Sequence, residues 1–512
     1  MSFQDLYGSW LENGYPLLEG RLLLWNEVKA LMQNYGCTSG CGVDYLTEQQ
    51  LKRLLRMAYH DGHVEIKSAV NLDRKRLVGY CERCGSNEQI IIQACASCGS
   101  DGAASVCATC EACINMGRST SCTPLFYFRE LELRDSQDML DSQESHDSPT
   151  LMPPVTYSPR QQAVAQQVEA FMHNCDQRQF LLWAVTGAGK TELCYPAISY
   201  ALERGQRVLF TAPRKDVIRE LAIRFKRDFP SVRISALYGD SPDKEQAARF
   251  YLATSQQTIR FYQYFDLVII DELDAFPYHN NPTLQGYVER AASAKREAKQ
   301  LLMTATPPAS WQYRIQQKHN KQMAHAILPL RFHGKPLPVP RVIITNIFTD
   351  YLAIIEQFFV EVERLEGCGL IFVPTVEAVH EWTNKINSRF SEKKLKNLKY
   401  FQKIKGIHAG DREYYKQVDK FREGEIRFLV TTTILERGVT FSNLHVLVLD
   451  ASHNIYDEST LVQIAGRVGR SQAYPGGLVW FASKYQTNSI KRSIKQIQRM
   501  NQRACLKNSF TI

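Results

Sequence analysis

No run of apolar residues in this 512-residue sequence approaches the roughly 20 residues that a membrane-spanning helix needs. The first ten residues, MSFQDLYGSW, contain no basic region followed by an apolar one, so we expect no secretory signal. Short-period repeats are absent as well. These absences predict a cytosolic protein, and they leave room for peripheral attachment to a membrane surface.

Cysteines are scarce outside one block, because ten of the 14 lie between Cys37 and Cys122. In a reducing compartment such a cluster is more typical of a metal site than of disulfides. The rest of the composition is that of a soluble globular protein, with 44% hydrophobic and 22% charged residues. The net charge of +9 and the pI near 8.8 favour a polyanionic partner, either nucleic acid or an acidic membrane surface.

CxxC steps occur in three segments of the cysteine-rich block: CERCG (81–85), CASCG (95–99) and CATCEAC (107–113). Two thiolates separated by two residues can bind one metal ion, and a glycine that follows allows the tight turn. Four such thiolates predict tetrahedral Zn²⁺. No Glu-His pair accompanies them in the sequence, so we expect a structural zinc site rather than a catalytic one. Buried or coincidental cysteines are the alternative interpretation.

The composition and the spacing of apolar residues change along the rest of the chain. Residues 1–79 are mixed, with helical spacing of apolar residues in LEGRLLLWNEVKALMQ and in LTEQQLKRLLRMAYHDGHV, where Thr47 and Glu48 could cap the helix. A cysteine-rich zinc module is expected at 80–130, and a linker rich in Ser, Asp and Pro at 131–154.

From residue 155 onward, short apolar runs alternate with amphipathic stretches. The runs are FLLWAV, VLFTAP, LVIID, LLMTATPP, GLIFVP, FLVTTT, HVLVLD and GLVWFAS. This alternation is typical of parallel α/β sheets, and there are too many units for one compact sheet. The segment PLPVP therefore predicts a division into two α/β domains, 155–337 and 338–512.

The segment AVTGAGKTE, residues 184–192, fits a phosphate-binding loop that follows the strand-like run FLLWAV. Gly187, Ala188 and Gly189 let backbone N–H groups close around a triphosphate, while Lys190 reaches its β and γ oxygens. Thr191 supplies a hydroxyl to Mg²⁺, and the helix that begins there adds its positive dipole end. The segment predicts binding of ATP with Mg²⁺. A Gly-rich turn with a chance lysine is the alternative.

The run LVIIDELDAFPYHNNP, residues 267–282, places an acidic pair at the end of a buried strand. Ligands bind at the carboxyl edge of the strands in a parallel sheet. We therefore predict that Asp271 holds Mg²⁺ and that Glu272 orients the attacking water. Asp274 is expected to link the nucleotide to the segment TATPP, residues 304–308, across the cleft.

Two segments of the second α/β domain, TTTILERGVTF (431–441) and QIAGRVGR (463–470), are expected to complete the nucleotide site. Arg467 and Arg470 are three residues apart, which places them on one face if the segment is helical. Across a cleft from the phosphate loop they could stabilise charge on the γ-phosphate during its cleavage, as arginine fingers do. For this segment alone, a basic helix end that faces solvent is the alternative.

Taken in order, these segments resemble the motor of superfamily 2 helicases and translocases. Four further segments match that group in order and spacing: SPRQQ (158–162), TAPRKDVIREL (211–221), LATSQQTIRF (252–261) and LIFVPT (370–375). The resemblance covers residues 155 to about 485. It implies two RecA-like domains in tandem, with ATP bound between them and a single strand of nucleic acid bound across both. It also implies that Gln161 senses adenine.

The same resemblance marks residues that are expected to contact nucleic acid. Proteins of this group mostly grip the phosphate backbone, which requires hydrogen-bond donors. The basic C-terminal stretch, with its helix-like repeat, could add weak attraction for DNA or acidic lipid. The candidate contacts are Arg214, Lys215, Ser255, Gln256, Thr432 and Thr433.

A closer resemblance is to the ComFA family, the late-competence DNA-uptake ATPases of Gram-positive bacteria. The segments IIDELDAFPY, APRKDVIREL, TTTILERGVTF, CINMGR and MNQRA carry it, so that it covers nearly the whole chain. It implies a motor at the inner face of the cell membrane that draws single-stranded DNA through the uptake channel. It also implies partnership with a ComFC-like phosphoribosyltransferase-fold protein and proximity to a DprA-like recombination mediator, and it allows a homo-oligomer.

The family pattern also implies a zinc ligand set. One CxxCG and a later CxxC map onto Cys81, Cys84, Cys110 and Cys113. Four more cysteines are extra for that pattern and could form a second zinc site or interleave with the first: Cys95, Cys98, Cys107 and Cys122. Cys37 and Cys41 stay unassigned.

A PriA-like replication-restart helicase is the alternative function, because those helicases also have clustered zinc cysteines. In that group, however, the cysteines lie within the second motor half, and the acidic motif ends in His where this chain has Asp274. A zinc-dependent adaptor with a degenerate motor is disfavoured by the presence of Lys190 and Arg470. Within AFPY, we expect Phe276 and Tyr278 to pack against the motor core.

Overall fold

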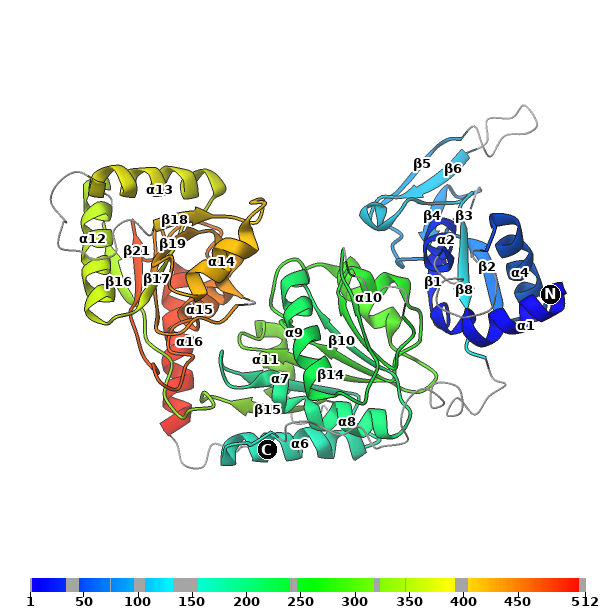
Figure 1. Cartoon of the computed structure of the whole chain (residues 1–512), viewed down its shortest axis with the longest axis horizontal. Helices are drawn as coiled ribbons and strands as arrows, with labels where there is room; N and C mark the ends of the chain where they lie inside the picture. Colours follow the sequence, from blue (N-terminus) through cyan, green and yellow to red (C-terminus); the bar gives the residue numbers. More distant parts are fainter. Residues whose placement is uncertain are drawn as a thin grey trace.

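The structure is a computed structural model, and it describes residues 2–33, 46–73, 75–95, 106–131, 155–239, 241, 246–316, 323–345, 347–391, 404–437 and 439–505. Along the chain these residues form an N-terminal module and two α/β units (Figure 1). The N-terminal module runs from α1 to β8, the first α/β unit from α6 to β15, and the second from β16 to α16. Among the helices of this described part, none is both long and apolar enough to cross a bilayer. The predicted linker lies almost wholly outside it.

The first α/β unit is built on a seven-stranded parallel sheet in the order β11-β12-β10-β13-β14-β9-β15. Nearly all of the residues of its inner strands are buried, as expected when helices or other elements cover both faces of a parallel sheet. The loops after β9 and β13 leave the same edge, so the phosphate-loop and acidic segments are brought together. The strands are β9 (Gln179–Ala184), β10 (Val208–Ala212), β11 (Ile234–Leu237), β12 (Phe250–Thr254), β13 (Leu267–Ile270), β14 (Lys299–Thr304) and β15 (Met323–Leu328).

The two faces of this sheet pack on different partners, because alternate residues of a strand point to opposite faces. Phe180 and Leu182 of β9 share a core with residues of α6 (Pro159–His173), α8 (Tyr195–Glu203) and α9 (Lys215–Asp228). Leu181 instead belongs to a second core that contains residues of α10 (Pro282–Ala291) and the cysteines of the N-terminal module. The N-terminal module is therefore packed against one face of the motor sheet rather than tethered beside it.

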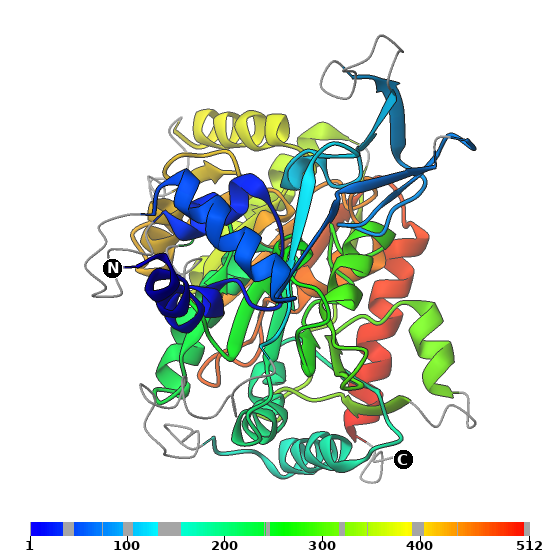
Figure 2. The same ribbon diagram turned by 90° about the vertical axis from the view of Figure 1, so that its right-hand side faces the viewer.

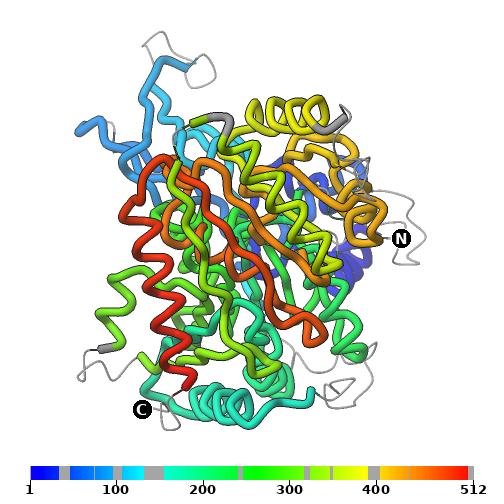
Figure 3. The backbone as a smooth tube through the Cα atoms, turned by 90° about the vertical axis from the view of Figure 1, so that its left-hand side faces the viewer, coloured from blue at the N-terminus to red at the C-terminus, as the bar shows by residue number. Residues whose placement is uncertain are grey.

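The second α/β unit has a six-stranded parallel sheet in the order β16-β21-β20-β17-β19-β18. Its last helix, α16 (Asn488–Cys505), runs beside the strands and ends next to α6 of the first unit (Figure 3), where Arg160 donates a hydrogen bond to the carbonyl of Ala504. The strands are β16 (Arg341–Ile344), β17 (Cys368–Phe372), β18 (Ile404–Ile407), β19 (Phe428–Thr431), β20 (Leu444–Val448) and β21 (Val479–Ser483). The other helices are α12 (Phe348–Arg364), α13 (Val376–Ser391), α14 (Tyr414–Arg422) and α15 (Glu458–Ala465).

The N-terminal module combines a helical part with three small sheets, and Figure 2 shows it from the side. The helices α1 (Phe3–Asn13), α2 (Trp25–Met32) and α4 (Glu48–His60) enclose a core around Trp10 and Tyr15 and pack on an antiparallel sheet. That sheet has the order β1-β8-β2, so β8 (Pro124–Phe128) pairs with both β1 (Leu22–Leu24) and β2 (Val64–Ser68). The cysteine-bearing strands between β2 and β8 are therefore an insertion into this part, and the predicted boundary at residue 79 falls inside one continuous module.

Those inserted strands form a two-stranded and a three-stranded antiparallel sheet. The first pairs β3 (Val70–Asp73) with β4 (Val78–Cys81). The second has the order β5-β6-β7 and comprises β5 (Ile90–Ala94), β6 (Val106–Cys110) and β7 (Ser119–Thr120). Figures 1 and 2 both show β5 and β6 extending away from the body of the molecule.

Most of the helices and strands that the sequence predicts are present in the structure. All eight apolar runs from residue 155 onward are parallel strands, and the cap predicted at Thr47 is present, because its hydroxyl accepts a hydrogen bond from the N–H of Gln50. The helix predicted over LEGRLLLWNEVKALMQ is partly wrong, since Leu22–Leu24 form strand β1 before α2 begins. The expectation for Phe276 is also wrong: its side chain is 81% exposed, whereas Tyr278 is buried.

Candidate functional site

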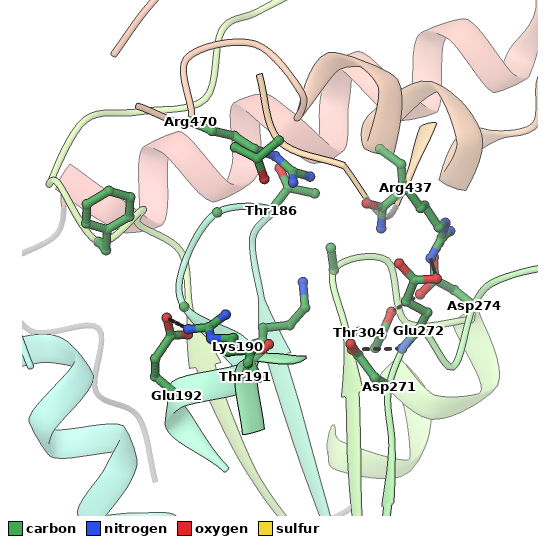
Figure 4. A pocket seen from close by; sticks show the side chains of 17 residues that line it. Thr186, Lys190, Thr191, Glu192, Asp271, Glu272, Asp274, Thr304, Arg437 and Arg470 are labelled. Carbon is green, nitrogen blue, oxygen red and sulfur yellow. Dashed lines mark hydrogen bonds and ion pairs between the residues drawn. The ribbon is translucent and has the colours of Figure 1, made fainter. Parts of the chain in front are cut away.

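The phosphate-loop residues line a cavity between the two α/β units, with a volume of about 970 Å³ including its open mouth (Figure 4). The loop joins β9 to α7 (Lys190–Leu193). Gly187 and Gly189 have φ angles of 76° and 80°, a left-handed conformation that glycine adopts without strain. Both glycines, Lys190 and Thr191 line the cavity, whereas Ala188 is buried beneath the loop. Burial lowers the pKa of Lys190, and the nearby charge of Asp271 opposes that shift.

Asp271 and Glu272 lie where β13 reaches the same cavity (Figure 4). Oδ1 of Asp271 accepts a hydrogen bond from the N–H of Glu272 at 2.9 Å. Glu272 has a φ of 55°, a left-handed conformation that is costly for a glutamate and that clusters at functional sites. Burial and the adjacent charge of Glu272 raise the pKa of Asp271 to about 6. A divalent cation would relieve this repulsion, so the pair fits Mg²⁺ held by Asp271 together with substrate phosphates.

Asp274 is the centre of a buried hydrogen-bond network. It accepts hydrogen bonds from the hydroxyls of Thr304 and Thr306 in the TATPP segment, each at 2.5 Å. From the second unit it accepts a hydrogen bond from the Ser459 hydroxyl at 2.5 Å and pairs with the Arg437 guanidinium at 2.7 Å. Burial alone would raise its pKa, but Arg437 and these hydrogen bonds hold the pKa of Asp274 below its ordinary value. The structure thus places Asp274 against the TATPP segment, as the sequence predicts, but that segment follows β14 in the same unit. The contacts across the cleft are instead those with Arg437 and Ser459.

Arg437 is a site residue that the sequence patterns did not single out. Its side chain is almost fully buried, lines the cavity, and lies between Asp274 and Glu272, whose Oε2 is 3.7 Å away. Burial lowers the pKa of Arg437, but the surrounding carboxylates raise that pKa by more, so the guanidinium stays positively charged. The sequence pattern that points to Arg437 is the segment TTTILERGVTF. It predicts a place in the nucleotide site, but it does not show which role its arginine has.

Arg467 and Arg470 do not share a helix face, which corrects the expectation for QIAGRVGR. The helix α15 ends at Ala465, and the arginines follow in a turn that Gly466 and Gly469 form. A Cβ at Gly466 would lie 2.0 Å from the Thr186 hydroxyl, so this glycine allows the turn to approach the phosphate loop.

The two arginines also differ in position. Arg470 lines the cavity beside Thr186, as Figure 4 shows. Arg467 is buried behind it, where its Nε donates to the carbonyl of Glu436 at 2.8 Å. Its Nη2 has no hydrogen-bond partner within the part of the chain that the structure describes. Burial lowers the pKa of both guanidinium groups, and the charge of Arg470 lowers that of Arg467 further. An anion in the cavity would relieve this cost, which fits a triphosphate.

Two side chains, those of Gln161 and Arg331, hold the phosphate loop from outside. Gln161 is buried and donates from Nε2 to the carbonyl of Ala188 at 3.0 Å, so the predicted adenine sensor contacts the loop directly. Arg331, on the segment between the two units, donates to the carbonyls of Thr186, Gly466 and Gly469. The next residue, Phe332, is partly exposed and lines the cavity. Arg331 thus joins the phosphate loop to the arginine-bearing turn through hydrogen bonds to backbone carbonyl oxygens of both.

The residues predicted to contact nucleic acid differ in position and exposure in the structure. Arg214 lies at the cleft, where it pairs with Glu436 at 2.7 Å and its Nη1 lies 3.4 Å from the carbonyl oxygen of Thr433. Arg214 and Thr433 are therefore brought together across the two units. Ser255 is fully buried and its hydroxyl lies 3.4 Å from that of Thr211, so in this arrangement its side chain does not reach the surface. The remaining candidates, Lys215, Gln256 and Thr432, are partly or fully exposed.

Four cysteines of the N-terminal module form a compact buried group: Cys81, Cys84, Cys110 and Cys113. All four sulfur atoms lie within 4.8 Å of one another, with separations of 3.9 Å for Cys81–Cys113 and 3.5 Å for Cys84–Cys110. Tetrahedral zinc with bonds of about 2.3 Å requires sulfur–sulfur edges of roughly 3.8 Å. The group therefore fits one Zn²⁺, and it is the set that the family pattern implies.

The remaining predicted cysteine ligands lie apart from that group. Cys95, Cys107 and Cys122 form a second group with sulfur atoms within 4.8 Å of one another. Cys98, the fourth predicted member, lies outside the described residues, as do the unassigned Cys37 and Cys41. The two groups share no cysteine. Among the described residues, the extra cysteines therefore do not interleave with the four-cysteine group.

The four-cysteine group is held against the first α/β unit by polar contacts with α10. The Tyr287 hydroxyl donates to the carbonyl of Ala112 at 3.3 Å, and Arg290 donates to the carbonyl of Glu82 at 2.5 Å. The buried Arg83 lies within the first CxxC step and pairs with Glu27 of α2 at 2.8 Å. Glu27 also pairs with Arg260 of the first unit at 2.9 Å. The helix α10 follows directly after the acidic segment, so the cysteine module and the cavity share one structural element.

Three family models match successive parts of the chain. Residues 44–127 match the competence protein ComFA N-terminal domain. Residues 155–309 match the model described as type III restriction enzyme, res subunit, and residues 350–472 match the helicase conserved C-terminal domain. The matches follow the three parts of the fold. They identify the cavity as the ATPase site of a helicase-like enzyme.

Two similar relatives bear the same name. The chain is 33% identical to "Competence protein ComFA" of Bacillus subtilis over 87% of this chain and 90% of that protein. It is 34% identical to "Competence protein ComFA" of Streptococcus pneumoniae, over 78% and 86%. Among solved structures, the Mycobacterium smegmatis helicase Lhr bound to ssDNA and AMP-PNP shares the fold, with a TM-score of 0.50, 16% identity and coverage of 67% of this chain and 50% of that one. The chain is an ATP-hydrolysing, helicase-like protein, and it belongs to the ComFA family of competence proteins.

Proposed function

We propose that the chain is an ATP-driven single-stranded DNA translocase that helps to draw transforming DNA into the cell during competence. The observation that carries the proposal is the buried network around Asp274, which links the ATPase cavity to both α/β units. A nucleotide-dependent change at this network would alter how the two units sit against each other. Relative motion of two units that both contact one strand is the basis of translocation.

The proposed chemistry assigns a role to each wall of the cavity. Lys190 and the backbone N–H groups of the loop hold the phosphates, while Glu272 orients the attacking water. Asp271 and Thr191 would hold Mg²⁺, which neutralises charge on the phosphates when bound. From the other unit, Arg470 lies where it can stabilise charge on the γ-phosphate. The site is complete only when the two units are closed.

The test is ATP hydrolysis by the full chain with single-stranded DNA, duplex DNA or RNA, in one buffer at a stated salt concentration. We expect the largest stimulation with single-stranded DNA, and loss of hydrolysis in Lys190→Ala, which removes the phosphate-binding cation. Displacement of streptavidin from the end of a biotinylated single strand would then report movement. Hydrolysis that no nucleic acid stimulates, or stimulation without displacement, would count against a translocase.

A PriA-like restart helicase has no specific support. The cysteine group precedes both α/β units, and the similar relatives are ComFA proteins. Unwinding of forked DNA separates the two functions, because a restart helicase must open duplex, whereas a translocase need only move along a single strand. Strong unwinding of forks would favour the restart helicase.

The proposal includes a structural zinc ion at Cys81, Cys84, Cys110 and Cys113, which would make residues 1–131 one zinc-stabilised module on the motor. Its support is the fit of the four sulfur atoms to tetrahedral zinc. The family resemblance supports partnership with a ComFC-like protein, proximity to a DprA-like mediator and the uptake channel, and a position at the inner face of the membrane. Co-purification with a ComFC-like protein from the same cells tests the first of these.

A further inference from the structure

The strand β6 carries cysteines on both of its faces. Cys107 and Cys110 are three residues apart, and alternate residues of a strand point to opposite sides, so these two point in opposite directions. Cys110 points to the buried four-cysteine group, with Cys81, Cys84 and Cys113. Cys107 points to the other face of the sheet. One strand thus supplies ligands to two places.

On that other face, Cys107 meets two cysteines from neighbouring segments. Cys95 directly follows β5, and Cys122 follows β7, the two strands that flank β6. The three sulfur atoms lie within 4.8 Å of one another, and those of Cys107 and Cys122 are 3.7 Å apart. That separation is close to the roughly 3.8 Å edge of a tetrahedral zinc–thiolate site. It is far longer than the bond of about 2.0 Å in a disulfide.

Hydroxyl groups surround these sulfur atoms. The Ser121 hydroxyl donates to the Cys107 sulfur at 3.1 Å, and that same oxygen accepts the N–H of Ala108 at 3.0 Å, which fixes its orientation. The Thr120 hydroxyl lies 3.3 Å from the Cys122 sulfur. Donors of this kind stabilise thiolates, and outer hydrogen bonds of this kind orient metal ligands. Three neutral thiols would need no such support.

We propose that Cys95, Cys107 and Cys122 form a second metal site, which takes Zn²⁺ or a similar thiophilic divalent ion. Among the described residues, the group comprises these three thiols. The group also contains an exposed residue, Cys122, whereas all four cysteines of the first group are buried. The second ion therefore exchanges faster than the first.

The test counts metal ions in the purified full chain and in three variants. We expect two zinc ions per chain in the parent protein, and one in Cys107→Ser and in Cys122→Ser. Cys175→Ser, which alters an exposed cysteine of the first α/β unit, serves as the matched control and keeps two. Cobalt substitution adds a spectroscopic readout, because the thiolate-to-cobalt absorption should fall in Cys107→Ser in proportion to the lost ligands.

Exchange kinetics separate the two sites. A chromogenic chelator should remove one equivalent of zinc at least about tenfold faster than the other, and Cys107→Ser should lose the fast phase alone. Unchanged ATP hydrolysis in Cys107→Ser would show that the variant is folded. One zinc ion per chain in the parent, with no change in Cys107→Ser, would overturn the proposal. This proposal is independent of the translocase function and of the first zinc site, since Cys110→Ser removes a different ion.

Discussion

At the scale of single residues, the buried Arg437 is the most consequential contact in the cavity. Removing one partner of a buried ion pair costs about 3–5 kcal/mol, because the other charge stays buried without compensation. In Arg437→Ala, both Asp274 and Glu272 would lose their cationic neighbour. This cost falls on the closed arrangement of the two units, since Arg437 and Asp274 come from different units. We therefore expect the closed form, and with it the rate of ATP hydrolysis, to fall at least about 100-fold, because 1.4 kcal/mol is a factor of ten in an equilibrium constant.

The matched control for this variant is Arg422→Ala on α14. Arg422 pairs with Asp419 at 2.7 Å, and both side chains are more than half exposed. Exposed ion pairs contribute about 0–1 kcal/mol, so this variant should hydrolyse ATP within about twofold of the parent rate. Equal losses in the two variants would show that Arg437 acts only through general stability.

A second prediction at this scale concerns pH and His445 on β20. Its Nδ1 accepts a hydrogen bond from the N–H of Leu478 at 3.0 Å, and burial lowers its pKa from 6.5 to about 4. The unfolded chain takes up the proton below pH 6.5 while the folded protein resists it. The stability that neutral His445 supports is therefore present above pH 6.5, and it is lost progressively down to about pH 4.

The effect can be measured with His445→Asn, whose side-chain oxygen can still accept from Leu478. Between pH 7 and pH 5 the free energy of unfolding of the second α/β unit should fall by about 2 kcal/mol more in the parent than in the variant. Urea denaturation at both pH values, with hydrogen exchange in β20 identifying the unit that unfolds, provides the numbers. Equal pH dependence in the two proteins would contradict the assignment.

At the scale of elements, the strands that the sequence patterns did not reveal are informative. Four of them, β11, β15, β16 and β18, lie at the edges of the two sheets. An edge strand has one neighbour, and β15, β16 and β18 are partly exposed, so polar residues interrupt their apolar runs: IKGI in β18 is an example. The inner strands are continuous apolar runs because they are buried on both faces. Pattern reasoning therefore finds the centre of a parallel sheet more readily than its edges.

The candidate site shows the same division. The phosphate loop and the acidic pair are local segments, and the sequence predicts that they lie together at one sheet edge. The contact of Arg437 with Asp274 joins residues 163 positions apart, and it depends on how two units dock. No local pattern encodes that docking. The turn at Gly466 illustrates the point, because the proximity of Thr186 in the other unit explains why this position has no room for a side chain.

Glu27 joins three elements and gives the prediction at this scale. It pairs with Arg83 of the cysteine module, whose side chain is fully buried, and with Arg260 of the first α/β unit, while it belongs to α2 itself. Glu27→Ala would leave two largely buried guanidinium groups without their carboxylate. We expect destabilisation of the N-terminal module by about 3–5 kcal/mol and loss of hydrogen-exchange protection in α2 and β4.

The control is Glu88→Ala, which alters an exposed glutamate of the same module and should leave protection unchanged. The zinc content of Glu27→Ala is a second readout, because the four-cysteine group does not use this carboxylate. We expect zinc to be retained. Normal protection in α2 and β4 of the variant would show that the module is held on the motor by α10 contacts alone.

At the scale of the whole molecule, the two α/β units meet through polar contacts as well as through a shared core. Besides the Asp274 network, Arg214 reaches Glu436, the Tyr415 hydroxyl donates to Asp216, and Gln496 donates to the carbonyl of Ala305. Polar contacts of this kind can be exchanged for contacts with water at modest cost when the units separate. An interface that opens and closes during each ATP cycle needs such contacts.

The last prediction separates two roles of Arg214, which is both a candidate DNA contact and part of this interface. If Arg214 holds the units together, Arg214→Ala should shift the molecule toward open forms by about 10- to 100-fold even without DNA, because the largely buried Glu436 loses its partner. Hydrogen exchange in the segment 433–436 and at the start of α9 should then rise in the absence of DNA. A role in DNA binding alone predicts no change without DNA and weaker stimulation of hydrolysis with it. Lys215→Ala alters the exposed neighbour, so it should affect only the DNA-dependent measurement. Unchanged exchange in Arg214→Ala without DNA would exclude its role in closing the two units.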